Sequence, residues 1–341
     1  MSAKPIAIRG TGLVTSVGLS APAACAAIRA RISNPTETRF IDSGGEWVMA
    51  HQVPLEKAWR GLAKLARMAA LAIAECLDRI PTEQWREVPL LLCVAERERP
   101  GRLDGLDDRL FADIGQVLGA RFAPDSGIIA HGRVGAVIAL MHARRLIYEK
   151  GHRQVLVAAT DSLVTWPTLG VYDAGERLLT PRNSNGFMPG EAGGALLVGR
   201  PRGGPELVCT GLGLGTEAAH IDSEEPLRAD GLTQAIQNAL ADAPCRMHDL
   251  DYRITDLSGE QYYFKEAALA LSRTLRRRKE AFDLWHPAEC IGETGATAGA
   301  AVIAVADAAC RKGYTPGPAI LAHMANDHGH RGAAVLQFRV A

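Results

Sequence analysis

The sequence lacks a charge excess, a long apolar run and any paired-cysteine motif. Its 38 basic residues match its 38 acidic residues, so neither nucleic acid nor an anionic membrane is favoured as the main partner. No uninterrupted apolar run reaches membrane-spanning length, and the opening residues MSAKPIAIRG contain no signal-peptide core. We therefore expect a soluble, cytoplasmic protein that does not insert into membranes.

Cysteine is also too scattered to build a framework. There are 7 cysteines, an odd number, and none stands in CxxC spacing. Isolated cysteines in apolar or helical segments usually pack as small hydrophobic side chains. This pattern predicts a reducing compartment and no disulfide framework. We expect no cofactor and no bound metal.

What the sequence does contain is a regular alternation of apolar strands and amphipathic helices. The continuous apolar runs at 88–96 and 153–162 are typical of strands in a sheet that is covered on both faces. Ser20 is placed as the N-cap of the first helix. Strands are predicted at 6–12, 88–96, 153–162 and 186–199, helices at 21–32, 55–80, 135–151 and 260–277, and a charged loop at 97–110.

The segment RPRGGPE (200–206) divides this pattern, because its two prolines and two glycines interrupt regular structure. Three elements before it recur after it in the same order. IAIRGTGL is echoed by ELVCTGLGLG, GAVIALMHARRLIYEKG by GAAVIAVADAACRKG, and GGALLVG by GAAVLQFRV. The repeat predicts two similar α/β halves, 1–199 and 200–341, with ligands favoured at their junction.

Four motifs resemble the β-ketoacyl synthase branch of the thiolase-like superfamily. They are the opening strand, turn and helix (6–33), QVLVAATDS (154–162), NGFMPGEAGGALLVG (185–199) and IGETGATAGAAVIAV (291–305). The third is the most specific, since it is similar to the family's GFVxGEGAGALVL hairpin. The resemblance implies a five-layered αβαβα thiolase fold built from two duplicated halves, and usually a homodimer.

The resemblance also implies a cysteine nucleophile at a helix N-terminus, and that cysteine is missing. It would lie in IIAHGRVGAVIALM (128–141). Counting back from the helix-ending Gly151 places it at Val134, whereas alignment from the strand places it at His131. A valine cannot attack a thioester, and an acyl-imidazole hydrolyses too readily to store an acyl group.

Three further positions of the family's site are changed as well. The two histidines that stabilise an enolate map to Ser258 and Glu293, and the lysine maps to Ala288. A carboxylate at position 293 would repel the developing enolate. The resemblance therefore implies an inactive member of the family, with Val134, Ser258, Glu293 and Ala288 as degenerate catalytic positions.

Histidines remain near the expected pocket. His323, His328 and His330 surround Asp327 in AHMANDHGH (322–330), and His131 is expected nearby in the fold. A metal site or an acid/base pair is the sharper interpretation of these side chains. The favoured interpretation is a polar loop that closes a vestigial pocket.

Two surface segments and one aromatic cluster are further candidates for a functional role. The resemblance assigns subunit pairing to the strand before the turn, so Ile128 and Ile129 are predicted to lie at a homodimer interface. The basic run 276–279 is interpreted as a solvated helix face, and a dock for an acidic protein is its alternative. The aromatic side chains at 262–264 are predicted to pack in the core, and a binding surface is the less favoured interpretation.

Three functions stay open. The favoured one is a non-catalytic scaffold, similar to short ketosynthase-like proteins found with type VI secretion effector genes, whose partner would be a secretion adaptor or effector. The second is a chain-length-factor-like partner subunit of an active fatty-acid or polyketide ketosynthase. The third is a divergent acyltransferase that uses Ser258 or a histidine.

Overall fold

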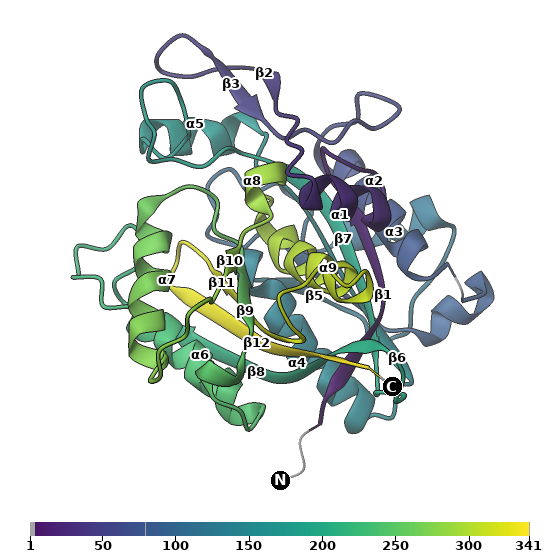
Figure 1. Cartoon of the computed structure of the whole chain (residues 1–341). Helices are drawn as coiled ribbons and strands as arrows, with labels where there is room; N and C mark the ends of the chain where they lie inside the picture. Colours follow the sequence, from purple (N-terminus) through teal and green to yellow (C-terminus); the bar gives the residue numbers. More distant parts are fainter. Residues whose placement is uncertain (1–3, 79, 341) are drawn as a thin grey trace.

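The computed structural model describes residues 4–78 and 80–340, which form one large sheet, a small hairpin and surrounding helices (Figure 1). The first half contributes the strands β1 (Ile6–Val14), β4 (Leu90–Val94), β5 (Gly127–Ala130), β6 (Gln154–Ser162) and β7 (Glu191–Gly199). The second half contributes β8 (Glu206–Thr216), β9 (Tyr252–Thr255), β10 (Leu284–Trp285), β11 (Ala319–Ala325) and β12 (His330–Arg339). The hairpin strands are β2 (Thr36–Ile41) and β3 (Trp47–Ala50).

The strand order shows the duplication directly. The sheet runs β5-β4-β6-β7-β1 through the first half and continues as β8-β12-β11-β9-β10 through the second. If the strands of each half are numbered 1 to 5 in chain order, both halves have the strand order 3-2-4-5-1 from the outer edge of the sheet to its centre. The antiparallel pairing of β1 with β8 joins them. The repeats predicted from the sequence occupy equivalent places: β1 and β8, helices α4 and α9, and β7 and β12.

Helices form the other layers (Figure 1). The helices α4 and α9 contact strands of both half-sheets and lie between them, whereas α2 and α3 cover the first half and α6 and α7 the second. This confirms the predicted αβαβα arrangement. The helices are α1 (Ala21–Arg29), α2 (Gly61–Cys76), α3 (Arg109–Leu118), α4 (Gly135–Tyr148), α5 (Trp166–Ala174), α6 (Asp230–Asp242), α7 (Gln261–Thr274), α8 (Ala288–Ile291) and α9 (Ala298–Arg311).

The helix α2 lies directly on the sheet because the strands beneath it carry glycine. A Cβ at Gly12 would lie 1.9 Å from the Ala72 carbonyl oxygen, and a Cβ at Gly193 would lie 2.3 Å from the Met68 carbonyl oxygen. A larger residue at either position would push α2 away from the sheet. This contact explains the glycine at position 193 of the motif at 190–199, whereas Gly194 of the same motif lies against Ala300 of α9.

Several predicted boundaries are wrong. The helix predicted at 55–80 is shorter and runs from Gly61 to Cys76. It cannot begin earlier because the Trp59 N–H closes a tight turn on the Lys57 carbonyl at 2.7 Å. Residue 79 lies outside the described residues. The predicted loop gives way to α3 at Arg109, a helix that the charged sequence concealed. The Ser20 cap is confirmed, since its hydroxyl accepts the Ala23 N–H.

The strand β5 ends the sheet at one edge. Among the described residues it pairs only with β4, in parallel, and its other edge is free. Ile129 is buried and Ile128 is half-buried. The pairing of subunits through Ile128 and Ile129 stays a prediction, as does the division into domains at 199/200. No helix in the described ranges is long and apolar enough to cross a membrane.

Substitutions in β5 test whether this edge pairs subunits. Ile128→Asp places a charge on a half-buried side chain that packs only partly against the core, whereas Ile129→Asp or Ile129→Pro changes a buried core residue. We expect each to shift the oligomer to the monomer mass in light scattering, and Ile128→Asp to keep the wild-type circular dichroism spectrum. An unchanged oligomeric mass for Ile128→Asp would contradict pairing through β5.

Candidate functional site

The helices α4 and α9 begin side by side at the junction of the two halves, and both begin in the same way. Each is preceded by a one-turn 3-10 helix, η2 (Gly132–Val134) or η4 (Gly295–Thr297), and these two turns contact each other. Gly132 has φ +52° and Gly295 has φ +55°, a left-handed backbone that favours glycine. The positive ends of two helix dipoles therefore lie close together.

Carboxylates occupy the space in front of these helix ends. Glu293 accepts the Gly295 N–H at 3.0 Å, and Asp161 accepts the Ala296 N–H at 2.7 Å. At the turn before α4, a Cβ on Gly132 would lie 2.0 Å from a carboxylate oxygen of Glu96. There is thus no room for a side chain at position 132 unless Glu96 moves.

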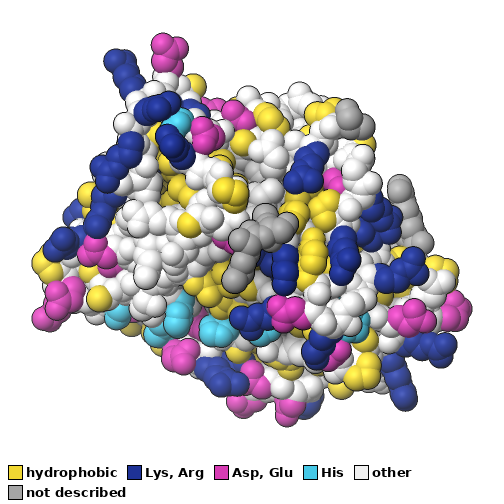
Figure 2. All heavy atoms as spheres, turned by 90° about the horizontal axis from the view of Figure 1, so that it is seen from below, with side chains coloured by type: hydrophobic (Ala, Val, Ile, Leu, Met, Phe, Trp, Pro, Cys, Tyr) yellow, Lys and Arg dark blue, Asp and Glu magenta, His cyan; other side chains and the backbone are white. Residues whose placement is uncertain are grey.

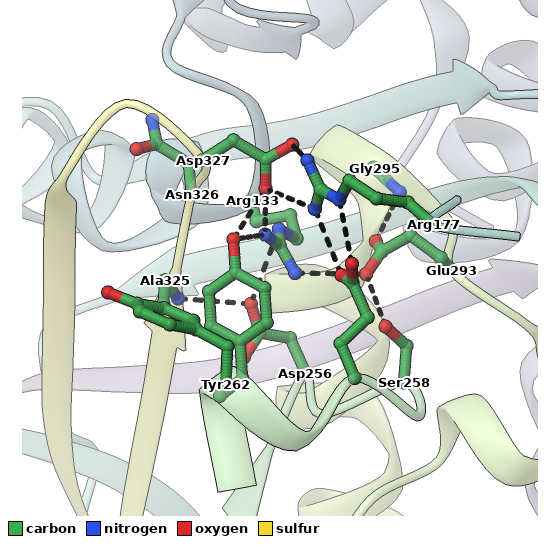
Figure 3. Close-up of polar contacts among 12 residues, drawn as sticks. Arg133, Arg177, Asp256, Ser258, Tyr262, Glu293, Gly295, Ala325, Asn326 and Asp327 are labelled. Carbon is green, nitrogen blue, oxygen red and sulfur yellow. Dashed lines mark hydrogen bonds and ion pairs between the residues drawn. The ribbon is translucent and has the colours of Figure 1, made fainter. Parts of the chain in front are cut away.

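Arg133 lies at the centre of a buried network (Figure 3). Its guanidinium donates through Nη1 to Glu293 at 3.0 Å, and through Nη2 to Asp327 at 2.7 Å and to the Tyr263 hydroxyl at 2.7 Å. Its Nε lies 3.8 Å from the Asp256 carboxylate. Figure 3 shows these acceptors converging on the guanidinium from several segments.

A second, half-buried arginine closes the network from the other side. Arg177 donates to both carboxylate oxygens of Glu260, at 2.7 and 2.9 Å, and to Asp327 at 2.8 Å. Asp327 thus bridges the two guanidiniums, and it also accepts a hydrogen bond from the Tyr172 hydroxyl at 3.2 Å. Charge-assisted, forked contacts of this kind are the strongest hydrogen bonds in proteins.

Two more buried arginines flank this centre. Arg99 donates through Nη2 to both oxygens of Asp161, at 2.6 and 2.5 Å. Arg331 is fully buried and donates to Glu266 at 2.8 Å. The junction between the halves, where a ligand was expected, is therefore filled with paired charges.

Burial and charge pairing move the carboxyl pKa values in opposite directions. Burial raises the pKa of Glu293 to about 7, against the opposing effect of Arg133 and the Gly295 N–H. Burial alone would also raise the pKa of Asp327, but Arg133 and Arg177 outweigh it and hold that pKa well below its usual range. Asp327 is thus a fixed negative charge, whereas Glu293 exchanges its proton near neutral pH.

Little free space remains inside the network. A cavity of about 20 Å³ lies among Glu96, Arg99, Arg133, Arg177, Glu293 and Asp327. A space of this size holds about one water molecule. It is far too small for an acyl chain or for the end of a carrier arm.

No family model matches this chain. A curated relative from Streptomyces cyaneus, "Putative polyketide beta-ketoacyl synthase 2", is 28% identical over 214 residues. The alignment covers 57% of this chain and 49% of the relative, so the chain spans about half the length of this relative.

Solved structures match over nearly the whole chain. The ishigamide ketosynthase/chain length factor aligns with a TM-score of 0.82 and 16% identity, covering 99% of this chain and 100% of that chain. The ketosynthase ApeO in complex with its chain length factor ApeC from Xenorhabdus doucetiae aligns with a TM-score of 0.77 and 14% identity, covering 98% of each. The chain has the thiolase-like fold of the ketosynthases. At these identities the likeness shows the fold alone, and it confirms the predicted fold.

The four residues predicted to be degenerate catalytic positions do not all lie together. The Ser258 hydroxyl donates to Glu293 at 3.0 Å, so these two residues share the site. Val134 is fully buried where η2 meets α4, and it packs near Gly332 in the core. Ala288 begins α8 and is half-buried, outside the polar contacts of the network.

The four histidines predicted to line a vestigial pocket lie in different surroundings, and none lines the described cavity. The rings of His131 and His330 meet edge to face at a centroid distance of 5.8 Å, with His330 exposed. His323 is buried against the Thr255 hydroxyl at 3.3 Å, and burial lowers its pKa to about 3. His328 is exposed. Among the described residues no group of three potential ligands could hold a metal ion.

The two central arginines were missed by the sequence analysis. Arg133 follows a glycine in an apolar turn, and an arginine between a buried strand and a buried helix is an available signal of a buried charge. Arg177 stands in a polar loop and gives no such signal. Tyr263 does pack in the core as predicted, but its hydroxyl also donates to Asp327.

Removing the central guanidinium tests the network. Arg133→Met leaves the buried Glu293 without its cationic partner and leaves Asp327 with Arg177 alone, so we expect the free energy of unfolding to fall by about 3–5 kcal/mol. Urea unfolding measures this loss. The matched control is Arg276→Met in the exposed basic run, for which we expect a change within about 0.5 kcal/mol. Equal effects of both substitutions would contradict a structural role for Arg133.

The raised pKa of Glu293 predicts a pH dependence of stability. A carboxyl whose folded pKa lies above its unfolded value stabilises the fold fully below the unfolded pKa, and this contribution is lost as the pH rises through the folded pKa. For Glu293 the window runs from its ordinary value of 4.5 to about 7, and the loss corresponds to at most about 3 kcal/mol. Glu293→Gln should flatten the curve of unfolding free energy between pH 5 and pH 8. An unchanged slope in this variant would show that other groups control the pH dependence.

Proposed function

We propose that this chain is a non-catalytic partner subunit of an active ketosynthase, in the manner of a chain length factor. The observation that carries the proposal is the filled junction. The place where the helices α4 and α9 begin holds the Arg133 ion pairs and a cavity of about 20 Å³, with space for about one water. A subunit that contributes surface rather than chemistry has no need of an open pocket.

The thiol nearest to the start of α4 does not restore a nucleophile. Cys93 in β4 packs against Gly135, where a Cβ would lie 3.3 Å from the Cys93 Cβ. It is fully buried, and burial raises the pKa of its thiol to about 12. A thiol that stays protonated and has no access to solvent does not attack a thioester.

The acyltransferase alternative also loses support. The Ser258 hydroxyl donates to Glu293, and Glu293 is already paired with Arg133. A serine nucleophile needs a neighbouring base that is free to take its proton, together with room for the acyl group. Glu293 is held by Arg133, and the cavity of about 20 Å³ beside it has no room for an acyl group, which speaks against this alternative.

Comparisons favour the partner-subunit alternative over the secretion scaffold. Two of the matched structures are named as a ketosynthase with a chain length factor, and one of them is a complex of the two. The expected role in loading type VI secretion effectors gains no support from these matches, and neither does a homodimer. The free edge of β5 is the surface through which we propose that the ketosynthase pairs with this chain.

Capture from native lysate tests the proposal. We expect the tagged chain to recover an active ketosynthase, and Ile128→Asp to recover much less of it, because the charge lies on the free edge of β5. The triple variant Arg276→Ser, Arg277→Ser, Arg278→Ser, which changes an exposed run elsewhere, should recover as much as the wild type.

A second readout addresses catalysis directly. After incubation with acyl-coenzyme A or acyl-carrier protein, the intact mass of this chain should stay unchanged. A stable acyl adduct that disappears in Ser258→Ala or His131→Ala would overturn the non-catalytic assignment. Recovery of a secretion adaptor or effector in place of a ketosynthase would overturn the choice of partner.

A further inference from the structure

Six arginines gather at the end of the sheet where β1, β7, β8 and β12 come together. We call Arg9, Arg153, Arg200, Arg202, Arg311 and Arg339 the arginine patch; all except the half-buried Arg9 are exposed. The patch lies at the C-terminal end of α9, whereas the Arg133 network lies at its N-terminal end. The 14 residues of α9 separate the two sites by roughly 20 Å.

Direct contacts hold the members together. Arg9 donates to the Arg200 carbonyl at 2.6 Å. Arg311 donates to the Ile8 carbonyl at 3.4 Å, beside Arg9, and to the Pro205 carbonyl at 3.3 Å. These contacts join the end of α9 to β1 and to the connection between β7 and β8.

The remaining members close the patch. Arg339 stands opposite Glu206 in the β8–β12 ladder, and the Arg202 backbone N–H donates to the Glu206 carboxylate at 2.8 Å. Arg9 is close enough to Arg202 and Arg153 for their charges to act on it. Figure 2 views the molecule from this end and shows Lys and Arg side chains bordering apolar atoms.

Carboxylates do not balance this charge. Glu206 is engaged by the backbone N–H groups of Arg202 and Gly203, and Asp307 is paired with Arg311 at 2.7 Å. In the described structure the side chains of Arg153, Arg202 and Arg339 make no hydrogen bond and no ion pair. The patch therefore carries an excess of positive charge, although the chain as a whole is neutral.

Arg9 shows the strain that this excess produces. Its Nε is buried and has no hydrogen-bond partner among the described atoms. Burial lowers the pKa of Arg9, the neighbouring charges of Arg202 and Arg153 lower it further, and Glu206 opposes them only in part. A negative group bound near Arg9 would offset the repulsion from the neighbouring arginines.

We propose that the arginine patch binds an acidic, extended segment of a partner protein. Guanidinium forks match carboxylates in geometry, and a flat cluster of several forks suits a chain of acidic side chains better than one small anion. Arg200 also stacks on Tyr148 at 4.9 Å, which offers an apolar contact to the same segment.

The test compares two triple variants that lose the same charge. Arg153→Ser, Arg202→Ser, Arg339→Ser removes three patch arginines that make no contacts of their own, and Arg276→Ser, Arg277→Ser, Arg278→Ser removes three exposed arginines elsewhere. The probe is a fluorescein-labelled peptide of ten glutamates, and its anisotropy is measured at low salt. We expect the patch variant to bind about tenfold more weakly or worse, the loss expected for three exposed ion pairs, and the control to stay within about twofold of the wild type.

Each other outcome overturns the proposal. Equally weakened peptide binding in the two variants would show that binding depends on the net charge of the protein and not on the patch. Absence of binding to the wild type would show that the patch does not bind carboxylates. Tighter binding of a ten-nucleotide single strand or of phosphatidylserine vesicles would assign the patch to another partner. The patch variant should still recover the ketosynthase, so failure here is separable from failure of the proposed function.

Discussion

The buried guanidinium of Arg133 fixes the positions of the side chains that accept its hydrogen bonds. Taking an arginine out of water costs several kcal/mol unless acceptors surround it on all sides. Arg133 belongs to the first half of the chain, whereas its acceptors Tyr263, Glu293 and Asp327 all belong to the second. The two halves therefore meet correctly only when three separate segments of the second half are already in place. The Arg133 contacts therefore tie the correct docking of the two halves to the correct placement of these three segments.

The same constraint decides what the junction can do. Two helix N-termini side by side form a natural site for an anion or for a developing negative charge. In this chain the protein's own carboxylates take that place, as Glu293 on the Gly295 N–H and Asp161 on the Ala296 N–H. The backbone N–H groups at the helix N-termini, which could stabilise a reacting anion, here bind the protein's own carboxylates and stabilise the fold. A subunit of this kind offers partners a rigid surface, which agrees with the role we propose.

The fold was largely predictable from the sequence, and the site only in part. The buried strands and the repeat of three elements could be predicted because each depends on a pattern of neighbouring residues in the sequence. Ser258 and Glu293 were predicted to lie in one site because the motifs around them fix their alignment, and the Ser258 hydroxyl does donate to Glu293; that they replace catalytic residues stays a prediction. The role of Arg177 could not be predicted, because its partners lie far away in the sequence and an arginine in a polar loop is usually solvated. Three of the four histidines are close in sequence, but they do not share a pocket: His323 is buried within β11, His328 is exposed in the turn after it, and His330 at the start of β12 meets His131.

The contact between Gly132 and Glu96 has a consequence for how this protein can evolve. A side chain at position 132 requires Glu96 to move, and an open pocket requires the Arg133 pairs to be dismantled. Loss of either partner of an Arg133 pair leaves a buried charge uncompensated, at a cost of about 3–5 kcal/mol in a fold that typically has only about 5–15 kcal/mol in reserve. A protein that lost one partner alone would therefore be close to unfolding. Opening the junction would take several coordinated substitutions, at position 133 and among its acceptors.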